Sequence, residues 1–187
     1  MALVTIRPTA TDIMIANAIA ENTNPPTEKL AEVLTWGADE HILRTLAAAW
    51  WLYTRAQDQS ARRAADHMLL TTLVASAIPH LLKSVFDQER PDRRTVSGHW
   101  RGVPLSGRSL DSFPSGHAVQ VGALASAACR LPKRKRNIAW LVGAGLVATR
   151  IILLAHWASD VLVGLAVGAI TERSLRELTG YGQEKRG

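Results

Sequence analysis

The sequence has a single cysteine, Cys129, and fewer acidic than basic residues. One cysteine cannot form a disulfide within the chain, so a small disulfide-stabilised scaffold is excluded. The 22 basic and 16 acidic residues leave a formal net charge of +6. With 47 % hydrophobic and 20 % charged residues, the 187-residue chain is too apolar for an intrinsically disordered protein, and its length predicts one domain.

Ionisable residues are absent from long stretches of the C-terminal half. Only Arg150 and His156 are ionisable between residues 138 and 159, and residues 161–171 contain none. The mean hydropathy of +0.02 resembles that of a soluble globule only because it averages these apolar stretches with charged segments. Apolar and polar residues do not alternate with a period of two in these stretches, and Ala and Leu outnumber β-branched residues, so we expect no strands.

Five apolar stretches are each close to the ~20 residues that cross a bilayer. They cover residues 39–56, 67–86, 114–131, 138–155 and 159–175. Small residues spaced as in closely packed transmembrane helices recur in the last two, at Gly143, Gly145, Gly164 and Gly168. The pattern predicts an all-α membrane bundle of about five transmembrane helices over residues 39–178. A soluble helical bundle is the alternative, because the first stretch contains Arg44.

Basic residues cluster after the first, third and fifth apolar stretches. They are Arg55, Arg62, Arg63, Arg130, Lys133, Arg134, Lys135, Arg136, Arg173, Arg176, Lys185 and Arg186. The positive-inside rule places these regions, with a tail at 179–187, in the cytoplasm, and segment 87–113 outside. The basic run at 132–137 lies between two apolar stretches and has no interleaved aromatics, so we expect no nucleic-acid partner.

Residues 1–38 form an N-terminal segment of different character. Two short helices are expected at 12–20 and 27–36, separated by Asn24 and two prolines. Leu30, Val33 and Leu34 share one helical face, which predicts an amphipathic helix on the membrane surface, with a soluble flap as the alternative. The first residues lack a basic start followed by an apolar run, so no signal peptide is expected.

Polar residues that interrupt the apolar stretches form three motifs. These are K-x6-R-P, P-S-G-H and R-x5-H-x3-D, with the functional candidates Lys83, Arg90, Ser115, Gly116, His117, Arg150, His156 and Asp160. Singly, each residue is as well explained by an interfacial anchor or a helix cap. All three motifs, however, lie on the predicted outer side, where ionisable groups at membrane depth indicate function.

Together these residue types suit phosphoryl transfer. Lys83, Arg90 and Arg150 supply positive charge, and Ser115 and Gly116 at a helix start supply backbone N–H donors for phosphate oxygens. One histidine can attack phosphorus while the other donates a proton to the leaving oxygen. A carboxylate four residues after His156 can hold that ring in the tautomer that exposes its other nitrogen. Such a site requires no metal and no other cofactor.

The three motifs, in this order, resemble the signatures of the type 2 phosphatidic acid phosphatase superfamily. The resemblance implies that His156 is the nucleophile that forms a phosphohistidine, that Asp160 orients it, and that His117 is the general acid. Lys83, Arg90, Arg150, Ser115 and Gly116 would bind the phosphoryl group. Thr149 stands where family members often have Ser, and the predicted five spans are one fewer than the six usual in membrane members, the first being absent.

The resemblance and the apolar helices together predict a bacterial inner-membrane phosphatase whose site faces outward. Its substrate is expected to be a lipid phosphate or diphosphate: undecaprenyl diphosphate, phosphatidylglycerol phosphate, phosphatidic acid or lipid A 1-phosphate. Residues of the outer segment are candidates for headgroup selection: Arg93, Arg94, His99, Trp100, Arg101 and Arg108. A vanadate-dependent haloperoxidase and a non-catalytic lipid-phosphate-binding membrane protein are the alternatives. The sequence does not fix the oligomeric state.

Overall fold

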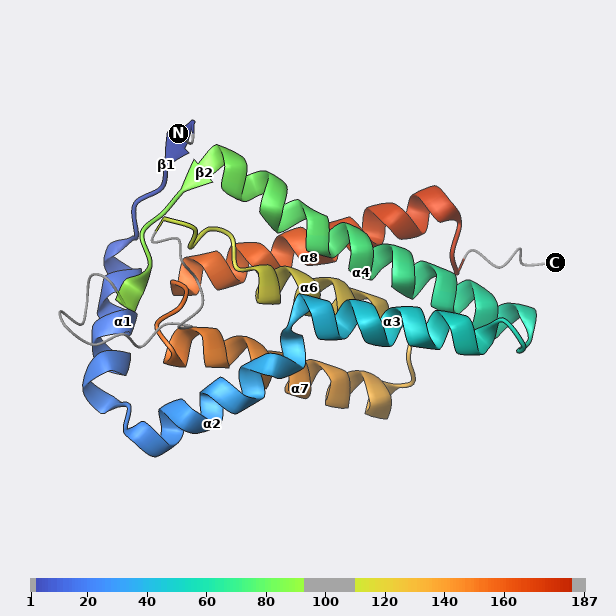
Figure 1. Ribbon diagram of the computed structural model, residues 1–187, viewed down its shortest axis with the longest axis horizontal. Coiled ribbons are helices and arrows are strands. Elements are labelled where there is room, and N and C mark those ends of the chain that lie inside the picture. Colours follow the sequence, from blue (N-terminus) through green and yellow to red (C-terminus); the bar gives the residue numbers. More distant parts are fainter. Residues whose placement is uncertain (1–2, 93–109, 183–187) are drawn as a thin grey trace.

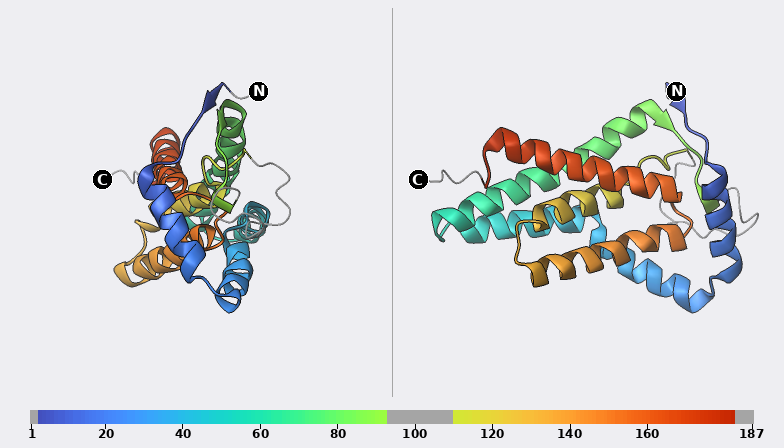
Figure 2. Two further views of the ribbon diagram at one scale, coloured as in Figure 1. Left: turned by 90° about the vertical axis from the view of Figure 1, so that its left-hand side faces the viewer. Right: turned by 180° about the vertical axis from the view of Figure 1, so that it is seen from behind.

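The computed structural model describes residues 3–92 and 110–182, and this part of the chain is mostly helical (Figure 1). An elongated bundle contains α3 (Glu40–Thr54), α4 (Gln59–Val85), α6 (Gly116–Ala128), α7 (Lys133–Ile152) and α8 (Ala158–Thr179). The helices expected from the five apolar stretches are therefore present. Helix α1 crosses one end of this bundle, and α2 runs from there along α7 (Figures 1 and 2).

Helix ends differ from the predicted ones where capping decides them. Helix α4 begins eight residues before the predicted 67, because the Asp58 side chain accepts a hydrogen bond from the Ala61 N–H and caps the helix there. Helix α7 also begins before the predicted 138, at Lys133 directly after Pro132, but without a side-chain cap. The basic residues that follow these starts lie outside the apolar stretches, yet they extend the helices.

The predicted number of membrane spans is not confirmed. In residues 3–92 and 110–182, only α4 is long and apolar enough, by length and composition, to cross a membrane. Helix α6 has 13 residues and is about 20 Å long at ~1.5 Å per residue, less than the ~30 Å of a hydrocarbon core. The five-span count therefore stays a prediction.

Small residues bring α6 and α8 into close contact along the centre of the bundle. A Cβ atom at Gly168 would collide with the Val119 carbonyl of α6, and one at Gly122 would collide with the Leu165 carbonyl of α8. The predicted close approach is confirmed at Gly143, Gly164 and Gly168, where a Cβ would collide with atoms of a neighbouring helix or of the residue before it, but is wrong at Gly145, where a Cβ would meet no atom within 4 Å. Because both helices begin at the same end, this contact fixes the relative positions of their first turns.

The N-terminal segment contains the two expected helices. Helix α1 (Ala10–Asn22) starts with a capping box of Thr9 and Asp12, and α2 (Pro25–Thr35) is capped by Asn24 and continues into the 3₁₀ helix η1 (Trp36–Ala38). The Asp12 carboxylate also accepts hydrogen bonds from the Ser159 N–H at 2.9 Å and the Ser159 hydroxyl at 2.8 Å. Helix α1 is therefore attached to the start of α8.

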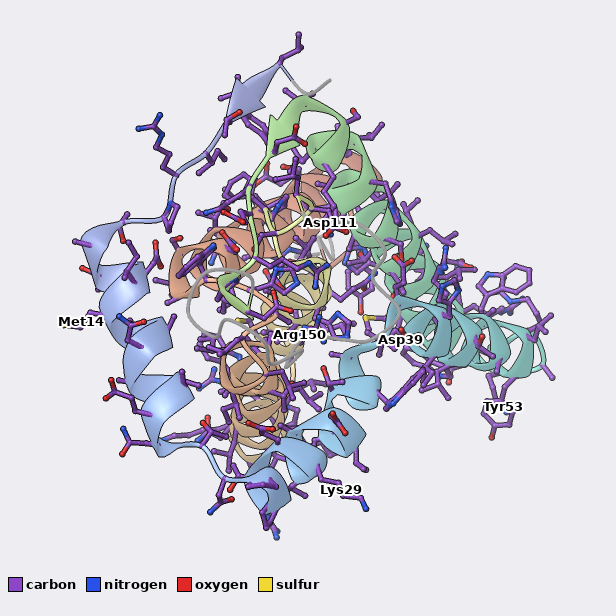
Figure 3. The ribbon with its side chains drawn as sticks, turned by 60° about the vertical axis from the view of Figure 1, so that its left-hand side comes forward. Met14, Lys29, Asp39, Tyr53, Asp111 and Arg150 are labelled. Atoms are coloured by element: carbon purple, nitrogen blue, oxygen red, sulfur yellow. The ribbon has the colours of Figure 1, made fainter. Side chains whose placement is uncertain are left out.

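The apolar face predicted on α2 points away from the protein. Leu30, Val33 and Leu34 are exposed, as is Met14 on α1, which points outward in Figure 3. Thr35, at the end of the same helix, is buried. One helix thus carries an uncovered apolar face and an inward-facing polar residue at its end.

The prediction that the chain has no strands is wrong at one place. Strand β1 (Val4–Thr5) pairs in parallel with β2 (Phe86–Asp87), with Val4 opposite Phe86. The pairing joins the start of the chain to the end of α4. Two-residue strands have no readable periodicity, and their partners are far apart in sequence, so local patterns cannot reveal them.

Candidate active site

The predicted site residues come together at one end of the bundle, from five different segments. Lys83 lies in the last turn of α4, His117 in the first turn of α6, Arg150 in the last turn of α7, and Asp160 in the first turn of α8. His156 lies between α7 and α8. Figure 3 shows Arg150 and Asp111 in the middle of this end, beside α1. The convergence predicted from the three motifs is thus observed.

His156 is buried and its ring has one defined tautomer. The Nδ1 atom lies 2.7 Å from the backbone carbonyl oxygen of Ser112. A carbonyl oxygen only accepts hydrogen bonds, so the proton of the neutral ring must be on Nδ1. The Nε2 atom then carries a free lone pair, as a nucleophile requires. Burial, reinforced by the nearby cations, lowers the pKa of His156 well below its usual range and keeps the ring neutral.

Asp160 acts on His156 less directly than the motif spacing predicts. Its Oδ2 atom lies 3.9 Å from His156 Nδ1, which is too far for a hydrogen bond. The same oxygen accepts hydrogen bonds from the Ser112 hydroxyl at 2.6 Å and the Trp157 N–H at 3.0 Å. The carboxylate therefore fixes the Ser112 segment, and the Ser112 carbonyl in turn orients the ring.

Asp111 lies between two of the predicted phosphate-binding cations. Its Oδ1 atom accepts hydrogen bonds from Arg90 Nε at 2.9 Å and lies 2.8 Å from Arg90 Nη2. Its Oδ2 atom is 3.8 Å from Lys83 Nζ. Arg90 is buried, whereas Asp111 is about one fifth exposed. This carboxylate neutralises part of the positive charge and holds the two cations together.

Arg150 is held by a residue of the N-terminal segment. Its Nη1 atom donates a hydrogen bond of 3.0 Å to the Thr35 hydroxyl at the end of α2. The backbone of Thr35 also lies beside His117. Among the described residues, the buried Arg150 Nε and Arg90 Nη1 atoms have no hydrogen-bond partner. Buried guanidinium N–H groups without acceptors are costly, so these two indicate a place for an anion.

Ser115 and Gly116 contribute differently from what the sequence predicts. The Ser115 N–H donates to the backbone carbonyl of Asp160 at 3.3 Å, so this backbone donor is used within the protein. The buried Ser115 hydroxyl, by contrast, has no partner among the described residues and caps no N–H of α6. Gly116 packs on Pro79 of α4, and a Cβ there would be in ordinary contact at 3.7 Å. The hydroxyl of Ser115 is thus the available donor.

A comparison with protein families agrees with these motifs. The model of the PAP2 superfamily matches residues 65–180, more than half of the chain. The chain belongs to the PAP2 superfamily. The resemblance inferred from the motifs is therefore confirmed.

Individual PAP2 relatives include lipid phosphatases. Lipid A 1-phosphatase of Rhizobium johnstonii is 30 % identical over 165 residues, which are 77 % of this chain and 64 % of the relative. Decaprenylphosphoryl-5-phosphoribose phosphatase of Mycobacterium tuberculosis is 32 % identical over 112 residues, 60 % of this chain and 59 % of the relative. The chain spans less than two thirds of the length of these curated relatives.

Two solved PAP2 structures share the fold. LpxE of Aquifex aeolicus superimposes with a TM-score of 0.68 at 18 % identity, covering 92 % of this chain and 99 % of that one. The transmembrane phosphatidylglycerolphosphate phosphatase of Bacillus subtilis superimposes with a TM-score of 0.63 at 21 % identity, and the match covers 95 % of this chain and 88 % of that one. The helical fold of these two structures is therefore also the fold of this protein.

Three site residues escape sequence reasoning. Asp111 and Ser112 are separated from the P-S-G-H motif only by Phe113, and their polarity so close to it is the one local signal that could have revealed them. Thr35 lies 115 residues from its partner Arg150, and nothing in its own segment indicates a catalytic neighbour. The candidates Arg93, Arg94, His99, Trp100, Arg101 and Arg108 lie outside the described residues. The described part of the chain holds no group of three or more His, Cys, Asp or Glu side chains suited to a metal ion.

Proposed function

We propose that the protein is an integral membrane phosphatase that removes a terminal phosphate from a lipid phosphate or diphosphate through a phosphohistidine. The observation that carries this proposal is the buried His156 ring, whose Nε2 atom is left free by the Ser112 carbonyl while Lys83, Arg90 and Arg150 surround the site. A nucleophile beside three cations matches the needs of phosphoryl transfer, which are an attacking lone pair and compensation of anionic charge.

The first half of the reaction forms the covalent intermediate. The Nε2 lone pair attacks phosphorus in line, an N–P bond forms, and the bond from phosphorus to the lipid oxygen breaks. His117, which takes up a proton when the anionic phosphate binds beside it, gives that proton to the lipid oxygen. Arg90 and Arg150 bind the phosphoryl oxygens through N–H groups that have no acceptor among the described residues, with Lys83 and the Ser115 hydroxyl as further donors.

The second half releases phosphate. A water molecule attacks the phosphoryl group, its proton returns to His117, and the N–P bond breaks. Inorganic phosphate leaves and the lone pair returns to Nε2. Asp160 stabilises the positive charge that the His156 ring carries while it is phosphorylated, and it keeps Ser112 in place.

A lipid substrate is supported by the position of the site and by the relatives. The site lies at the end of an apolar bundle, where a lipid headgroup can enter laterally from the interface. The relatives include a lipid A 1-phosphatase, a decaprenylphosphoryl-5-phosphoribose phosphatase and a phosphatidylglycerolphosphate phosphatase. Lipid A 1-phosphate, phosphatidylglycerol phosphate, phosphatidic acid and undecaprenyl diphosphate are the candidate substrates, at the outer face of a bacterial inner membrane.

The N-terminal helices complete the proposed membrane arrangement. With the catalytic end outside, α1 and the exposed apolar face of α2 lie at the outer interface, where Leu30, Val33 and Leu34 contact lipid. Bundle residues 39–178 form the membrane-embedded domain, and 179–187 form a cytoplasmic tail. Five spans and these domain bounds remain part of the proposal.

Phosphate release from a panel of the four lipid phosphates, with the full chain in detergent, tests the function. We expect turnover that EDTA does not abolish and that vanadate, a phosphate analogue, inhibits. His156→Ala and His117→Ala should each lose activity, whereas His41→Ala is the matched control because that histidine is exposed on α3. Full activity in both site variants contradicts the mechanism. Halide oxidation with added vanadate favours the haloperoxidase alternative, and lipid binding without turnover favours a non-catalytic binding protein.

A further inference from the structure

A second polar site lies at the opposite end of the bundle. A cavity of about 860 Å³ opens between the start of α4, the end of α6 and the end of α8. Helix α4 carries Lys83 at its other end, and α6 and α8 begin at the catalytic end, so the length of the bundle separates the two sites (Figures 1 and 2). The residues used in the argument are Ser60, Arg63, His67, Leu70, Arg130 and Tyr181, all of which line the cavity.

The cavity is built on a buried carboxylate that the proposed reaction does not use. Glu172 of α8 is fully buried, and it accepts hydrogen bonds from His67 Nε2 of α4 at 3.0 Å and from the Ser126 hydroxyl of α6 at 2.6 Å. Arg176 Nη2 lies 3.4 Å from the same carboxylate. A buried carboxylate is tolerated only when it is paired, and here donors from α4, α6 and α8 meet it. These contacts join the three helices beside the cavity.

Two cationic groups of the cavity have no acidic partner. Among the described residues, no carboxylate lies within 4.0 Å of the Arg63 or Arg130 guanidinium. Asp66 also lines the cavity, but it is occupied by Arg55, whose Nη2 atom lies 2.7 Å from Oδ1. The Trp51 indole N–H donates to the same oxygen at 2.7 Å. The cavity therefore favours an anion.

His67 adds a polar atom without a partner. Its ring stacks on Tyr181, with ring centroids 4.2 Å apart, and is almost fully buried. Because Nε2 faces the Glu172 carboxylate, it carries the proton of the neutral ring, so the buried Nδ1 atom, which has no hydrogen-bond partner among the described residues, is an acceptor for a headgroup hydroxyl and not for a phosphate oxygen. Ser60 supplies a hydroxyl in the first turn of α4, where the positive end of the helix dipole also attracts anions.

We propose that this cavity binds the phosphate-bearing headgroup of an anionic phospholipid from the bilayer leaflet opposite the catalytic site. The cavity is large for inorganic phosphate and lies within the ~300–1,000 Å³ typical of sites for larger ligands. Leu70, which lines it, is partly exposed and begins the apolar part of α4, along which acyl chains can lie. Basic pockets between membrane helices recognise anionic headgroups in this way. The proposal rests on the proposed function only in placing the bundle in a bilayer.

Binding of phosphatidylglycerol to the full chain in micelles, counted by native mass spectrometry, tests this site. Phosphatidylglycerol contains a phosphodiester, which the proposed reaction does not cleave, so the measurement is independent of turnover. We expect phosphatidylglycerol to bind at least tenfold more tightly than zwitterionic phosphatidylcholine. Arg63→Gln and Arg130→Gln should each weaken binding about fivefold, and the double variant more than tenfold. Arg62→Gln is the matched control, because Arg62 is the neighbouring exposed arginine and does not line the cavity.

The outcomes separate the possible ligands. Equal binding of both lipids, or unchanged phosphatidylglycerol binding in a double variant that keeps the wild-type Tm, overturns the proposal. If inorganic phosphate binds in a way that depends on Arg63 and Arg130, while the two lipids bind equally, the ligand is a soluble anion and the lipid proposal is overturned. If the protein releases no phosphate from the lipid panel but still binds phosphatidylglycerol more tightly than phosphatidylcholine, the proposed function is refuted and the second site stands.

Discussion

Substitution of Asp160 by Asn tests how the nucleophile is oriented. If the carboxylate fixed the His156 tautomer directly, removing its charge would misplace the proton on the ring. In the structure the Ser112 carbonyl holds Nδ1 at 2.7 Å, while Asp160 Oδ2 is 3.9 Å away. The Asn side chain has the same shape, and its oxygen can still accept from Ser112 and Trp157. We therefore expect the tautomer to survive in Asp160→Asn.

The expected loss is electrostatic, and its size follows from the distance. A unit negative charge 3.9 Å from a ring that becomes positive on phosphorylation contributes about 4 kcal/mol at an effective dielectric constant of ~20. Since about 1.4 kcal/mol corresponds to a factor of ten, the upper limit of the loss is roughly 10³ in kcat/KM. His156→Ala removes the nucleophile itself and should fall to the background rate.

Steady-state phosphate release measured for Asp160→Asn, Ser112→Ala and His156→Ala provides the check. Ser112→Ala removes the hydroxyl that binds Asp160 but keeps the carbonyl that binds His156, so we expect a loss of about tenfold, as for one charge-assisted hydrogen bond. Asp160→Asn should lie between the other two variants. An Asp160→Asn enzyme as inactive as His156→Ala would refute the indirect role of the carboxylate.

Three further predictions address pH, the N-terminal segment and helix packing. Because burial lowers the pKa of His156, the ring stays neutral as the pH falls through the ordinary value of ~6.5, so protonation of this ring should not lower kcat/KM there. The test uses Asp160→Asn, which has no carboxyl group beside the ring, and a decline of its kcat/KM centred at ~6.5 contradicts the prediction. The basic limb of the kcat profile should then report deprotonation of the general acid in the substrate complex. Thr35→Val removes the hydroxyl that accepts a hydrogen bond from Arg150 and should cost about 1–3 kcal/mol of transition-state binding. We expect kcat/KM to fall in Thr35→Val and to be restored in Thr35→Ser. Unchanged kinetics in Thr35→Val would exclude a positioning role. Gly168→Ala places a methyl group against the α6 backbone and should lower the free energy of unfolding by about 1–3 kcal/mol in a denaturation assay. Gly145→Ala is the control: its methyl group meets no atom within 4 Å, and it should raise the free energy of unfolding by up to about 1 kcal/mol, because alanine is the better helix former.

The N-terminal segment illustrates what local patterns can and cannot reveal. Two short helices are predicted there because Asn24 and the prolines that follow are local signals, and both helices are observed. The link between Asp12 and Ser159 depends on a contact across 147 residues. A hydrogen bond between such distant residues leaves no trace in the composition of either segment. The same reason hides the hydrogen bond from Arg150 to Thr35.

The sequence by itself determined the apolar helices, the family and the residue types of the site, because helix periodicity and motif spacing are local properties. Lys83, Arg90, His117, Arg150, His156 and Asp160 are all identified by their motifs and all reach one end of the bundle. Only the tertiary structure decided their partners: the Ser112 carbonyl on His156, Asp111 between the cations and Thr35 on Arg150. Those partners follow from the close approach of α6 to α8 and from the path of α1 and α2 across the bundle, and neither is encoded within a single segment.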